Sequence, residues 1–449
     1  MKFSKNILCV GAGYVGGPTM AIIALKCPEY KVTVVDINEE RIGRWNSDDL
    51  PIYEPGLLDA VKAARGKNLF FSTAIPEGIR AADIIFVSVN TPTKTFGLGA
   101  GMASDLQYWE KTAHQIVTYS EKSKIIVEKS TLPVRTAEAM ERILSENKKN
   151  IHFEVVSNPE FLAEGSAVDD LLEPNRVLIG SQQTESGFKA AREIAAIYAH
   201  WVPIEKIITT NLWSAELSKL VANAFLAQRI SSINAISALC EKTDADVAEI
   251  SFAVGSDKRI GFEFINASIG FGGSCFKKDI LNLVYICRSY GLNEVAAYWE
   301  MVVKMNDFQQ ERFVRKIIRE MFNTIVAKKI VLLGFAFKAN TGDTRESPGI
   351  YVAKKLLEER AALVICDPQA LENARKDLAG LGGDVVYEPD PYRAAKAAQA
   401  IAVITEWEIF KKLDFEKIFT AMQKPAFVFD GRNILDHHRL FQIGFNVFP

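Results

Sequence analysis

One short stretch of the chain combines the residue types of a covalent catalyst. Residues 271–280 read FGGSCFKKDI, so two glycines and a serine precede Cys275, and two lysines and Asp279 follow it. A cysteine attacks carbon as its thiolate, which cations and helix N-termini favour. The apolar run after Asp279 predicts a helix that begins near this residue. We therefore predict that Cys275 is a nucleophile. The other cysteines are predicted to be small buried residues, namely Cys9, Cys27, Cys240, Cys287 and Cys366.

A second pattern lies near the N-terminus, where KNILCVGAGYVGG places Gly11, Gly13 and Gly16 directly after a predicted strand. In a dinucleotide-binding turn the first glycine permits the tight turn. The second lets the backbone approach a pyrophosphate, and the third lets the helix pack on the strand. Asp36 ends the next predicted strand, at the distance expected of an acid that binds a ribose diol. Because a carboxylate repels a 2′-phosphate, Asp36 favours NAD over NADP, although Arg41 lies nearby.

Together the two patterns predict a dehydrogenase with a nucleophilic cysteine. A nicotinamide takes a hydride from an alcohol and leaves a carbonyl, and a thiolate adds to an aldehyde to form a thiohemiacetal. Loss of a second hydride gives a thioester, which water releases as an acid. Two other classes remain open. A two-electron hydroxyacid or acyl-CoA dehydrogenase would not need Cys275, and a non-catalytic NAD-binding protein would have no use for the thiol.

Bulk composition narrows the class of protein. The 449 residues are 48% hydrophobic and 24% charged, which predicts two or three globular domains. The 53 basic and 55 acidic residues give a net charge of -2. That balance disfavours nucleic acid and membrane surfaces as partners. The scattered cysteines, the absence of a C-x-x-C pair and the short first apolar run predict a cytoplasmic enzyme with free thiols and no metal.

The order of the apolar segments predicts an α/β protein with two Rossmann-like, doubly wound domains. Strand-like runs such as KVTVVDI and ADIIFVSVN alternate with helical patterns in residues 1–210, the predicted NAD-binding domain. Residues 211–250 lack glycine and proline, which predicts a long central helix within a helical, dimerising domain at 211–323. A second α/β pattern covers 324–449, with Ser347 as a helix cap; Gly291 ends an earlier helix.

Nearly the whole chain resembles the UDP-glucose 6-dehydrogenase family, in its eukaryotic-type branch. The resemblance is carried, in order, by GAGYVGGPTMA, NSDDLPIYEPGL, VSVNTPTKT, VEKSTLPVRTAE, SNPEFLAEG, ASIGFGGSCFKKDILNLVY and GFAFKANTGDTRESP. It implies oxidation of UDP-glucose to UDP-glucuronate, a polysaccharide precursor, with two NAD and one water. A sister enzyme that acts on GDP-mannose or a UDP-N-acetylhexosamine is the alternative. The resemblance also implies self-association as a dimer or hexamer.

The resemblance assigns roles residue by residue. Cys275 matches the nucleophile, and Lys219 matches the amine that stabilises the alkoxide and oxyanion. Asn223 matches the partner of Lys219, one helical turn away, and Asp279 matches the carboxylate that orders Lys219 and water. The residues that match those holding and activating the hydrolytic water are Thr131 and Glu160.

Binding residues follow in the same way. Those implied for the cofactor are Gly11, Gly13, Tyr14, Val15, Gly16, Asp36, Arg41, Val89, Thr91, Ser130, Thr131, Glu164 and Arg345. Those implied for the nucleotide sugar are Glu160, Phe161, Leu162, Glu164, Lys219, Asn223, Arg259, Phe264, Phe271, Gly272, Cys275, Phe276, Phe337, Lys338 and Arg432. Arg259 matches an arginine that reaches into a neighbouring subunit. The chain departs from the family at Asn266, often lysine in animals, and at Ala339 and Asn340.

Overall fold

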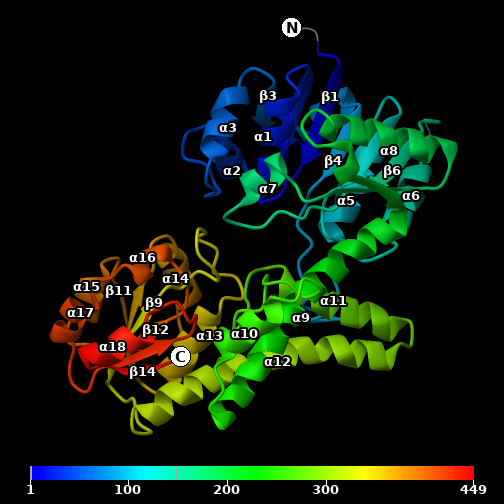
Figure 1. The fold of residues 1–449 in the computed structure, drawn as a ribbon. Coiled ribbons are helices and arrows are strands. Elements are labelled where there is room, and N and C mark those ends of the chain that lie inside the picture. The colour runs from blue at the N-terminus through cyan, green and yellow to red at the C-terminus, as the bar shows by residue number, and fades with distance from the viewer. Residues whose placement is uncertain (1–2, 148) are drawn as a thin grey trace. The chain divides into compact units, whose positions relative to one another are not determined.

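A computed structural model describes residues 3–147 and 149–449. The chain divides into two compact units, Met1–Ala222 and Asn223–Pro449. Each unit has its own sheet of mostly or wholly parallel strands (Figure 1). The helix α9 (Leu212–Thr243) is 32 residues long and contains the division between the units. The predicted fold class is confirmed. The division into three domains at residues 210 and 323 stays a prediction.

The first unit is built on an eight-stranded sheet with the order β3-β2-β1-β4-β5-β6-β7-β8. All neighbouring strands are parallel except β6 and β7. The order reverses between β1 and β4, which is where such sheets bind ligands beyond the carboxyl ends of their strands. The strands are β1 (Lys5–Val10), β2 (Tyr30–Val35), β3 (Leu69–Ser72), β4 (Ile84–Val87), β5 (Lys124–Glu128), β6 (Phe153–Ser157), β7 (Val177–Ser181) and β8 (Ile207–Asn211).

Helices cover both faces of this sheet, and the side chains of β1 show why. Ile7 and Cys9 belong to one buried cluster, whereas Leu8 and Val10 belong to another. Alternate residues of a strand point to opposite faces, so a strand buried on both faces is apolar throughout. The helices are α1 (Gly16–Lys26), α2 (Glu39–Trp45), α3 (Leu57–Ala64), α4 (Ile75–Ala81), α5 (Gln107–Tyr119), α6 (Thr136–Ser145), α7 (Ala167–Leu172) and α8 (Glu185–Tyr198).

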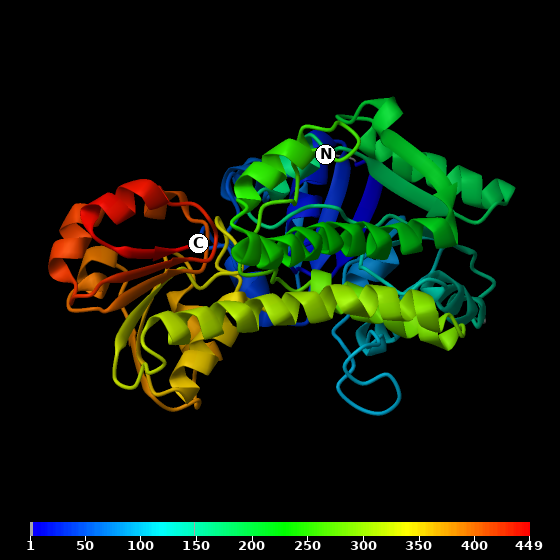
Figure 2. The same cartoon turned by 60° about the horizontal axis from the view of Figure 1, so that its bottom comes forward.

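The second unit combines long helices with a six-stranded parallel sheet of order β11-β10-β9-β12-β13-β14. The part of α9 in this unit lies beside α12 (Asn293–Glu320), and Ser231 donates to the Val302 carbonyl across them (Figure 2). Two further helices are α10 (Val247–Gly255) and α11 (Phe276–Ser289). The strands are β9 (Lys329–Leu333), β10 (Ala362–Cys366), β11 (Asp384–Tyr387), β12 (Ala400–Val403), β13 (Phe427–Asp430) and β14 (Asn446–Phe448). The sheet's helices are α13 (Pro348–Glu358), α14 (Leu371–Asp377), α15 (Pro391–Ala395), α16 (Glu408–Lys411), α17 (Phe415–Ala421) and α18 (His437–Ile443).

Local signals in the sequence predicted several element ends correctly. The Ser347 side chain accepts the Gly349 N–H at the start of α13, and Gly291 follows α11 with a left-handed φ of +74°. The strands β3, β7, β8, β11 and β14 were not predicted. β3, β11 and β14 have only three or four residues, and β8 ends in polar residues, whereas β7 has a buried apolar run that was overlooked. Among the described residues, no helix has the length and apolar character needed to cross a bilayer.

Candidate active site

The turn between β1 and α1 has three glycines; two of them have no room for a side chain, and the third faces open space. Gly11 has a φ of +108°, and a Cβ there would lie 2.3 Å from the Ser88 carbonyl oxygen. A Cβ on Gly16 would lie 2.0 Å from the Gly11 carbonyl oxygen. A Cβ on Gly13 would meet no described protein atom within 4 Å. Gly13 is therefore the point at which a pyrophosphate has room to approach the backbone.

Asp36 follows β2 directly and packs against this turn. Its Oδ2 accepts the Ala12 N–H at 2.9 Å and pairs with Arg41 Nη1 at 3.0 Å, while Oδ1 accepts the Asn38 N–H at 3.0 Å. Asp36 is only 8% exposed, so its carboxylate is fixed in place. Arg41, the nearby cation noted in the sequence, forms an ion pair with this acid. The glycine turn and Asp36 together fit a dinucleotide with a free ribose diol.

The loops after β4 and β5 bring together four residues predicted for the cofactor. The Thr91 hydroxyl donates to the Thr131 carbonyl at 3.0 Å, and the Ser130 hydroxyl donates to the Val89 carbonyl at 2.7 Å. β4 and β5 are adjacent in the sheet, so these loops leave the same edge as the glycine turn. Ligands bind at this edge in parallel α/β sheets.

Glu54 is a residue that sequence reasoning missed. Its carboxylate accepts the Tyr14 hydroxyl, and it also accepts the N–H groups of Gly165 at 2.5 Å and Ala167 at 3.1 Å. It therefore joins the glycine turn to the loop that carries the half-buried Glu164. Val15, the residue after Tyr14, is the N-cap residue of α1. The only signal for Glu54 was its presence in NSDDLPIYEPGL, which gave it no role.

Glu160 lies in the loop after β6, and hydrogen bonds hold its carboxylate. Oε1 accepts the N–H groups of Phe161 at 2.8 Å and Leu162 at 3.1 Å. Oε2 lies 2.9 Å from Lys129 Nζ and accepts the Thr19 hydroxyl at 3.4 Å. Burial alone would raise the pKa of Glu160, but Lys129 and the Phe161 N–H outweigh it and lower the pKa below its ordinary value. Glu160 is thus an ionised carboxylate at neutral pH.

Phe161 is stacked against two cations. The Arg176 guanidinium carbon lies 3.8 Å from the ring centroid, and Lys219 Nζ lies 5.3 Å from it. Both distances are within the range of a cation–π interaction. This contact brings the predicted catalytic amine Lys219 to the predicted substrate loop, while Leu162 packs against the core. Arg176 gave no signal in the sequence, because its stacking depends on a loop from another strand.

Two buried glutamates lie close to Thr131. Glu128, the last residue of β5, has both carboxyl oxygens buried without a hydrogen-bond partner among the described residues. Glu216 accepts the N–H groups of Arg135 at 2.7 Å and Ala137 at 2.8 Å. Burial raises the pKa of Glu216 to about 7, and burial and the charge of Glu216 raise the pKa of Glu128. The pair therefore keeps a proton to a higher pH than exposed carboxyls do. It lines a small pocket with Ser130, Thr131, Leu132, Ser157, Pro159 and Lys219.

Cys275 lies in the second unit. It is exposed, whereas the other five cysteines of the chain are buried. The predicted helix start near Asp279 was wrong, since α11 begins at Phe276 and Cys275 is its N-cap residue. The first-turn N–H groups of a helix lack intrahelical partners and favour an anion at this position. The Ser274 hydroxyl lies 3.6 Å from Sγ, and Lys277 pairs with Glu346 at 3.1 Å. Cys275 is thus an exposed sulfur at the start of a helix, where a substrate could reach it.

The five other cysteines are buried, as predicted. Burial raises the pKa of Cys9, Cys27 and Cys366 to about 12, and it also raises the pKa of Cys287. These thiols stay protonated at neutral pH and are poor nucleophiles.

Asp279 and Asn223 are brought together by α11 and α9. Asn223 Nδ2 donates to Asp279 Oδ2 at 2.6 Å, and Lys278 Nζ lies 3.7 Å from Oδ1. Asp279 is 1% exposed, so the Asn223 amide supplies a hydrogen bond to a buried carboxyl group. The predicted pairing of Asp279 with Lys219 involves both units and stays a prediction.

Three phenylalanines predicted for the nucleotide sugar form one aromatic cluster. The Phe271 and Phe276 ring centroids are 5.7 Å apart, and those of Phe264 and Phe276 are 6.4 Å apart, both edge to face. Phe264 has a left-handed φ of +62° and is partly exposed. Asn306 holds the Phe271 backbone through both its N–H and its carbonyl. A Cβ on Gly272 would lie 2.5 Å from the Glu346 carbonyl oxygen, so the loop before Cys275 needs glycine there.

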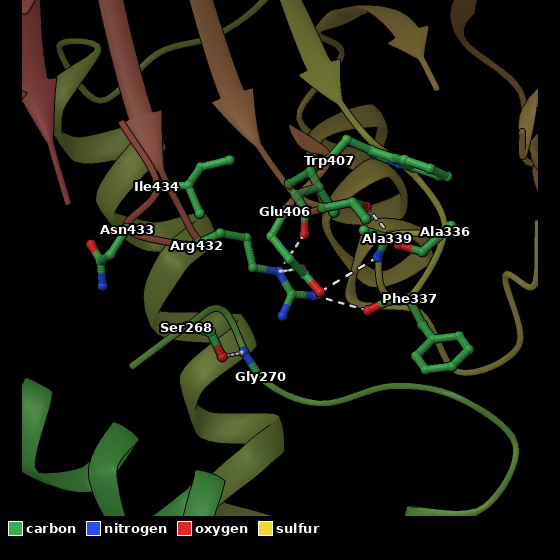
Figure 3. Close-up of polar contacts among 12 residues, drawn as sticks. Ser268, Gly270, Ala336, Phe337, Ala339, Glu406, Trp407, Arg432, Asn433 and Ile434 are labelled. Carbon is green, nitrogen blue, oxygen red and sulfur yellow. Dashed lines mark hydrogen bonds and ion pairs between the residues drawn. The ribbon is translucent and has the colours of Figure 1, made fainter. Parts of the chain in front are cut away.

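Arg432 is anchored beyond the carboxyl end of β13 (Figure 3). Its Nε donates to the Ile404 carbonyl at 2.7 Å and lies 3.2 Å from Glu406 Oε2, and its Nη2 donates to the Phe337 carbonyl at 3.0 Å. The guanidinium is therefore held in one orientation beside Phe337, as a planar fork for diphosphate requires. Glu406 also accepts the Ala339 N–H at 3.4 Å. Sequence reasoning missed Glu406.

The remaining predicted residues are more exposed. Lys338 Nζ lies 5.8 Å from the Phe337 ring centroid, and Arg345 Nε contacts both Asp343 oxygens, at 3.0 and 2.9 Å. The Arg259 side chain is 88% exposed and forms a bidentate ion pair with Asp257. This carboxylate raises the pKa of Arg259. Asn266 is exposed. Asn340 has a φ of +62°, which asparagine tolerates better than most residues.

Known proteins are similar to this chain in sequence and in fold. Three domains of the UDP-glucose/GDP-mannose dehydrogenase family match the chain: the NAD binding domain at residues 5–202, the central domain at 213–308 and the UDP binding domain at 331–437. UDP-glucose 6-dehydrogenase 2 of Arabidopsis thaliana is 60% identical over 461 residues, covering 99% of this chain and 96% of that protein. The chain belongs to the UDP-glucose/GDP-mannose dehydrogenase family.

Other members of this family extend the comparison. UDP-glucose 6-dehydrogenase 3 of Oryza sativa subsp. japonica is 59% identical over 463 residues, with coverage of 99% and 96%. The UDP-glucose dehydrogenase of Pyrobaculum islandicum has a TM-score of 0.87 at 31% identity and covers 100% of this chain and 98% of its own. A UDP-D-ManNAc dehydrogenase of Pyrococcus horikoshii has a TM-score of 0.80 at 25% identity, with 96% of each chain covered. The predicted family and the predicted cofactor, NAD, are confirmed.

Proposed function

We propose that this protein oxidises UDP-glucose to UDP-glucuronate by four electrons, with two NAD and one water. The observation that carries the proposal is the near full-length likeness, at 60% identity, to plant UDP-glucose 6-dehydrogenases. It favours UDP-glucose over GDP-mannose or a UDP-N-acetylhexosamine, because the UDP-ManNAc dehydrogenase is only 25% identical. NAD held by Gly13, Asp36 and the loops after β4 and β5 would accept one hydride in each oxidation.

The chain's own residues supply the covalent chemistry in this proposal. Lys219 stabilises the C6 alkoxide as the first hydride leaves. The Cys275 thiolate then adds to the C6 aldehyde, forming a carbon–sulfur bond and a hemithioacetal oxyanion. Loss of the second hydride leaves a thioester on Cys275, and water cleaves it to the carboxylate and the free thiolate. The support is that Cys275 is exposed at a helix N-terminus while the other five cysteines are buried.

Hydrolysis needs groups that hold water, and Thr131 and Glu160 are proposed for this role. Glu160 is an ionised carboxylate beside the loop predicted to contact the sugar. Asn223 and Asp279 are proposed to order Lys219 and water. Arg432, Lys338 and Phe337 are proposed to hold the UDP group, which agrees with the match of residues 331–437 to the UDP binding domain.

Product analysis tests the proposal. Purified protein with UDP-glucose and NAD is expected to release two NADH per sugar and to yield UDP-glucuronate. The same assay with GDP-mannose and UDP-N-acetylglucosamine is the control for substrate choice. Turnover confined to one of these sugars, or one NADH per UDP-glucose, would reject the proposal.

We further propose that the protein self-associates and works in the cytoplasm. The second unit exposes many apolar side chains on its helices, which monomers rarely do. They include Phe225, Ile236 and Leu239 on α9, Phe252 on α10, and Tyr298, Met301 and Phe308 on α12. The six free cysteines are typical of a reducing compartment. Light scattering of the purified chain tests the first point, since a monomer at assay concentration would contradict it.

A further inference from the structure

Lys129 carries a buried ammonium that no sequence signal singled out. It follows β5 directly, and its side chain is 3% exposed. Its Nζ lies 2.9 Å from Glu160 Oε2, and it donates to Asn158 Oδ1 and to the Tyr198 hydroxyl at 3.1 Å each. An ammonium has three N–H donors. Three acceptors meet them, so the charge is fully satisfied although it is buried.

A further set of contacts holds these acceptors in place. The Tyr198 hydroxyl donates to Asn158 Oδ1 at 2.6 Å. The other end of that amide, Nδ2, donates to the Leu178 carbonyl on β7 at 2.8 Å. This bond fixes which end of the amide faces Lys129. Residues of α8, β7 and the loop after β6 therefore position one ammonium against one carboxylate.

Electrostatics tie the charge of Glu160 to this lysine. Burial alone would lower the pKa of Lys129, but Glu160 and Tyr198 outweigh it and raise that pKa, so the amine stays charged. At Glu160 the effect of Lys129 exceeds that of Lys219, the other cation that acts on it. The second donor to Oε2, the Thr19 hydroxyl, is neutral and lies at 3.4 Å. Lys129 is therefore the main reason that Glu160 is ionised while buried.

We propose that Lys129 is a positioning residue for hydrolysis of the Cys275 thioester, because it holds the Glu160 carboxylate charged and in one orientation. This inference rests on the proposed function. Lys129 touches neither substrate nor cofactor in it, and acts through Glu160 alone. Formation of the thioester does not need Glu160, so the two halves of the reaction should respond differently to loss of the lysine.

The test compares Lys129→Met with Lys124→Met. Lys124 is a matched control: it is a buried lysine on β5 whose ammonium donates to the backbone carbonyls of Arg80 and Ala82. Each variant is mixed with UDP-glucose and NAD, and the Cys275 acyl-enzyme is followed by intact mass spectrometry together with NADH. In Lys129→Met we expect thioester formation within about threefold of wild type and hydrolysis slowed at least about tenfold, so that the acyl-enzyme accumulates.

The pH profile provides a readout that a purely structural role would not move. Without Lys129, the buried Glu160 carboxyl keeps its proton to a higher pH, so the acid limb of hydrolysis should move upward. Lys124→Met should leave the acid limb unshifted and accumulate no acyl-enzyme. The same two results in Lys129→Met would overturn the inference. If Lys129→Met does not fold, Tyr198→Phe decides, because it removes one acceptor and keeps the ion pair. We expect hydrolysis about threefold slower, and a wild-type rate would overturn the inference. A wild-type enzyme that forms no thioester would instead reject the proposed function.

Discussion

The Glu128–Glu216 pair makes the stability of the first unit depend on pH in a direction that can be stated. Both carboxyls are buried, and burial raises the pKa of each, so the pair keeps a proton to a higher pH than exposed carboxyls do. Replacing Glu216 by glutamine keeps the shape of the side chain. The new amide can donate an N–H to Glu128 and has no proton that titrates. Glu141, which also acts on Glu128, is unchanged in this variant.

The sign and size follow from the raised pKa of Glu216. That pKa rises from 4.5 to about 7, a difference equivalent to about 3 kcal/mol. Below pH 4.5 both the folded and the unfolded chain hold the proton, and its full stabilisation is present. Between about pH 4.5 and pH 7 only the folded state keeps it, so the free energy of unfolding falls as the pH rises. In Glu216→Gln the group that titrates is gone, so this loss should disappear.

Thermal denaturation at about pH 5 and about pH 7.5 measures the effect. For a unit of this size about 3 kcal/mol corresponds to roughly 6–12 °C in the melting temperature. Between the two conditions the wild type should therefore lose most of this amount in excess of Glu216→Gln. Glu146→Gln, an exposed change at the end of α6, is the control and should behave as wild type. Parallel curves for wild type and Glu216→Gln would refute the raised pKa of Glu216.

Three further predictions concern the candidate site. Cys275→Ala should lower NADH release at least about a thousandfold without changing the melting temperature. The control Cys287→Ala, a buried cysteine within α11, should lower stability and spare activity. An active Cys275→Ala enzyme would contradict the covalent mechanism. Asp36→Asn should weaken NAD binding about tenfold, measured by calorimetry, because the ribose diol loses a charged acceptor. An unchanged affinity would show that Asp36 does not bind the cofactor. Asn223→Ala should cost about 1–3 kcal/mol in urea unfolding, because Asp279 loses a buried donor; a wild-type midpoint would show that the contact carries little weight.

Residues close together in the chain were predictable from the sequence. The glycine turn and Asp36 lie within one βαβ unit, so strand, turn and acid follow from local pattern alone, and the structure places Asp36 against the turn. The same holds for Cys275, because glycines and an apolar run on its two sides predicted a loop before a helix. The helix start was misplaced by a few residues, since cap geometry depends on backbone angles that composition does not determine.

Only the tertiary structure decided which distant residues meet. Glu54 contacts the N–H of Gly165 across 111 residues of sequence, and Lys129 meets Glu160 because β5 and β6 are neighbours in the sheet. Arg176 stacks on Phe161 for a similar reason. Strand order and loop path set these contacts, and neither is written in the periodicity of any one segment. The sequence by itself thus determined the chemistry that is available, and the packing of strands determined which charges are buried together and in what protonation state.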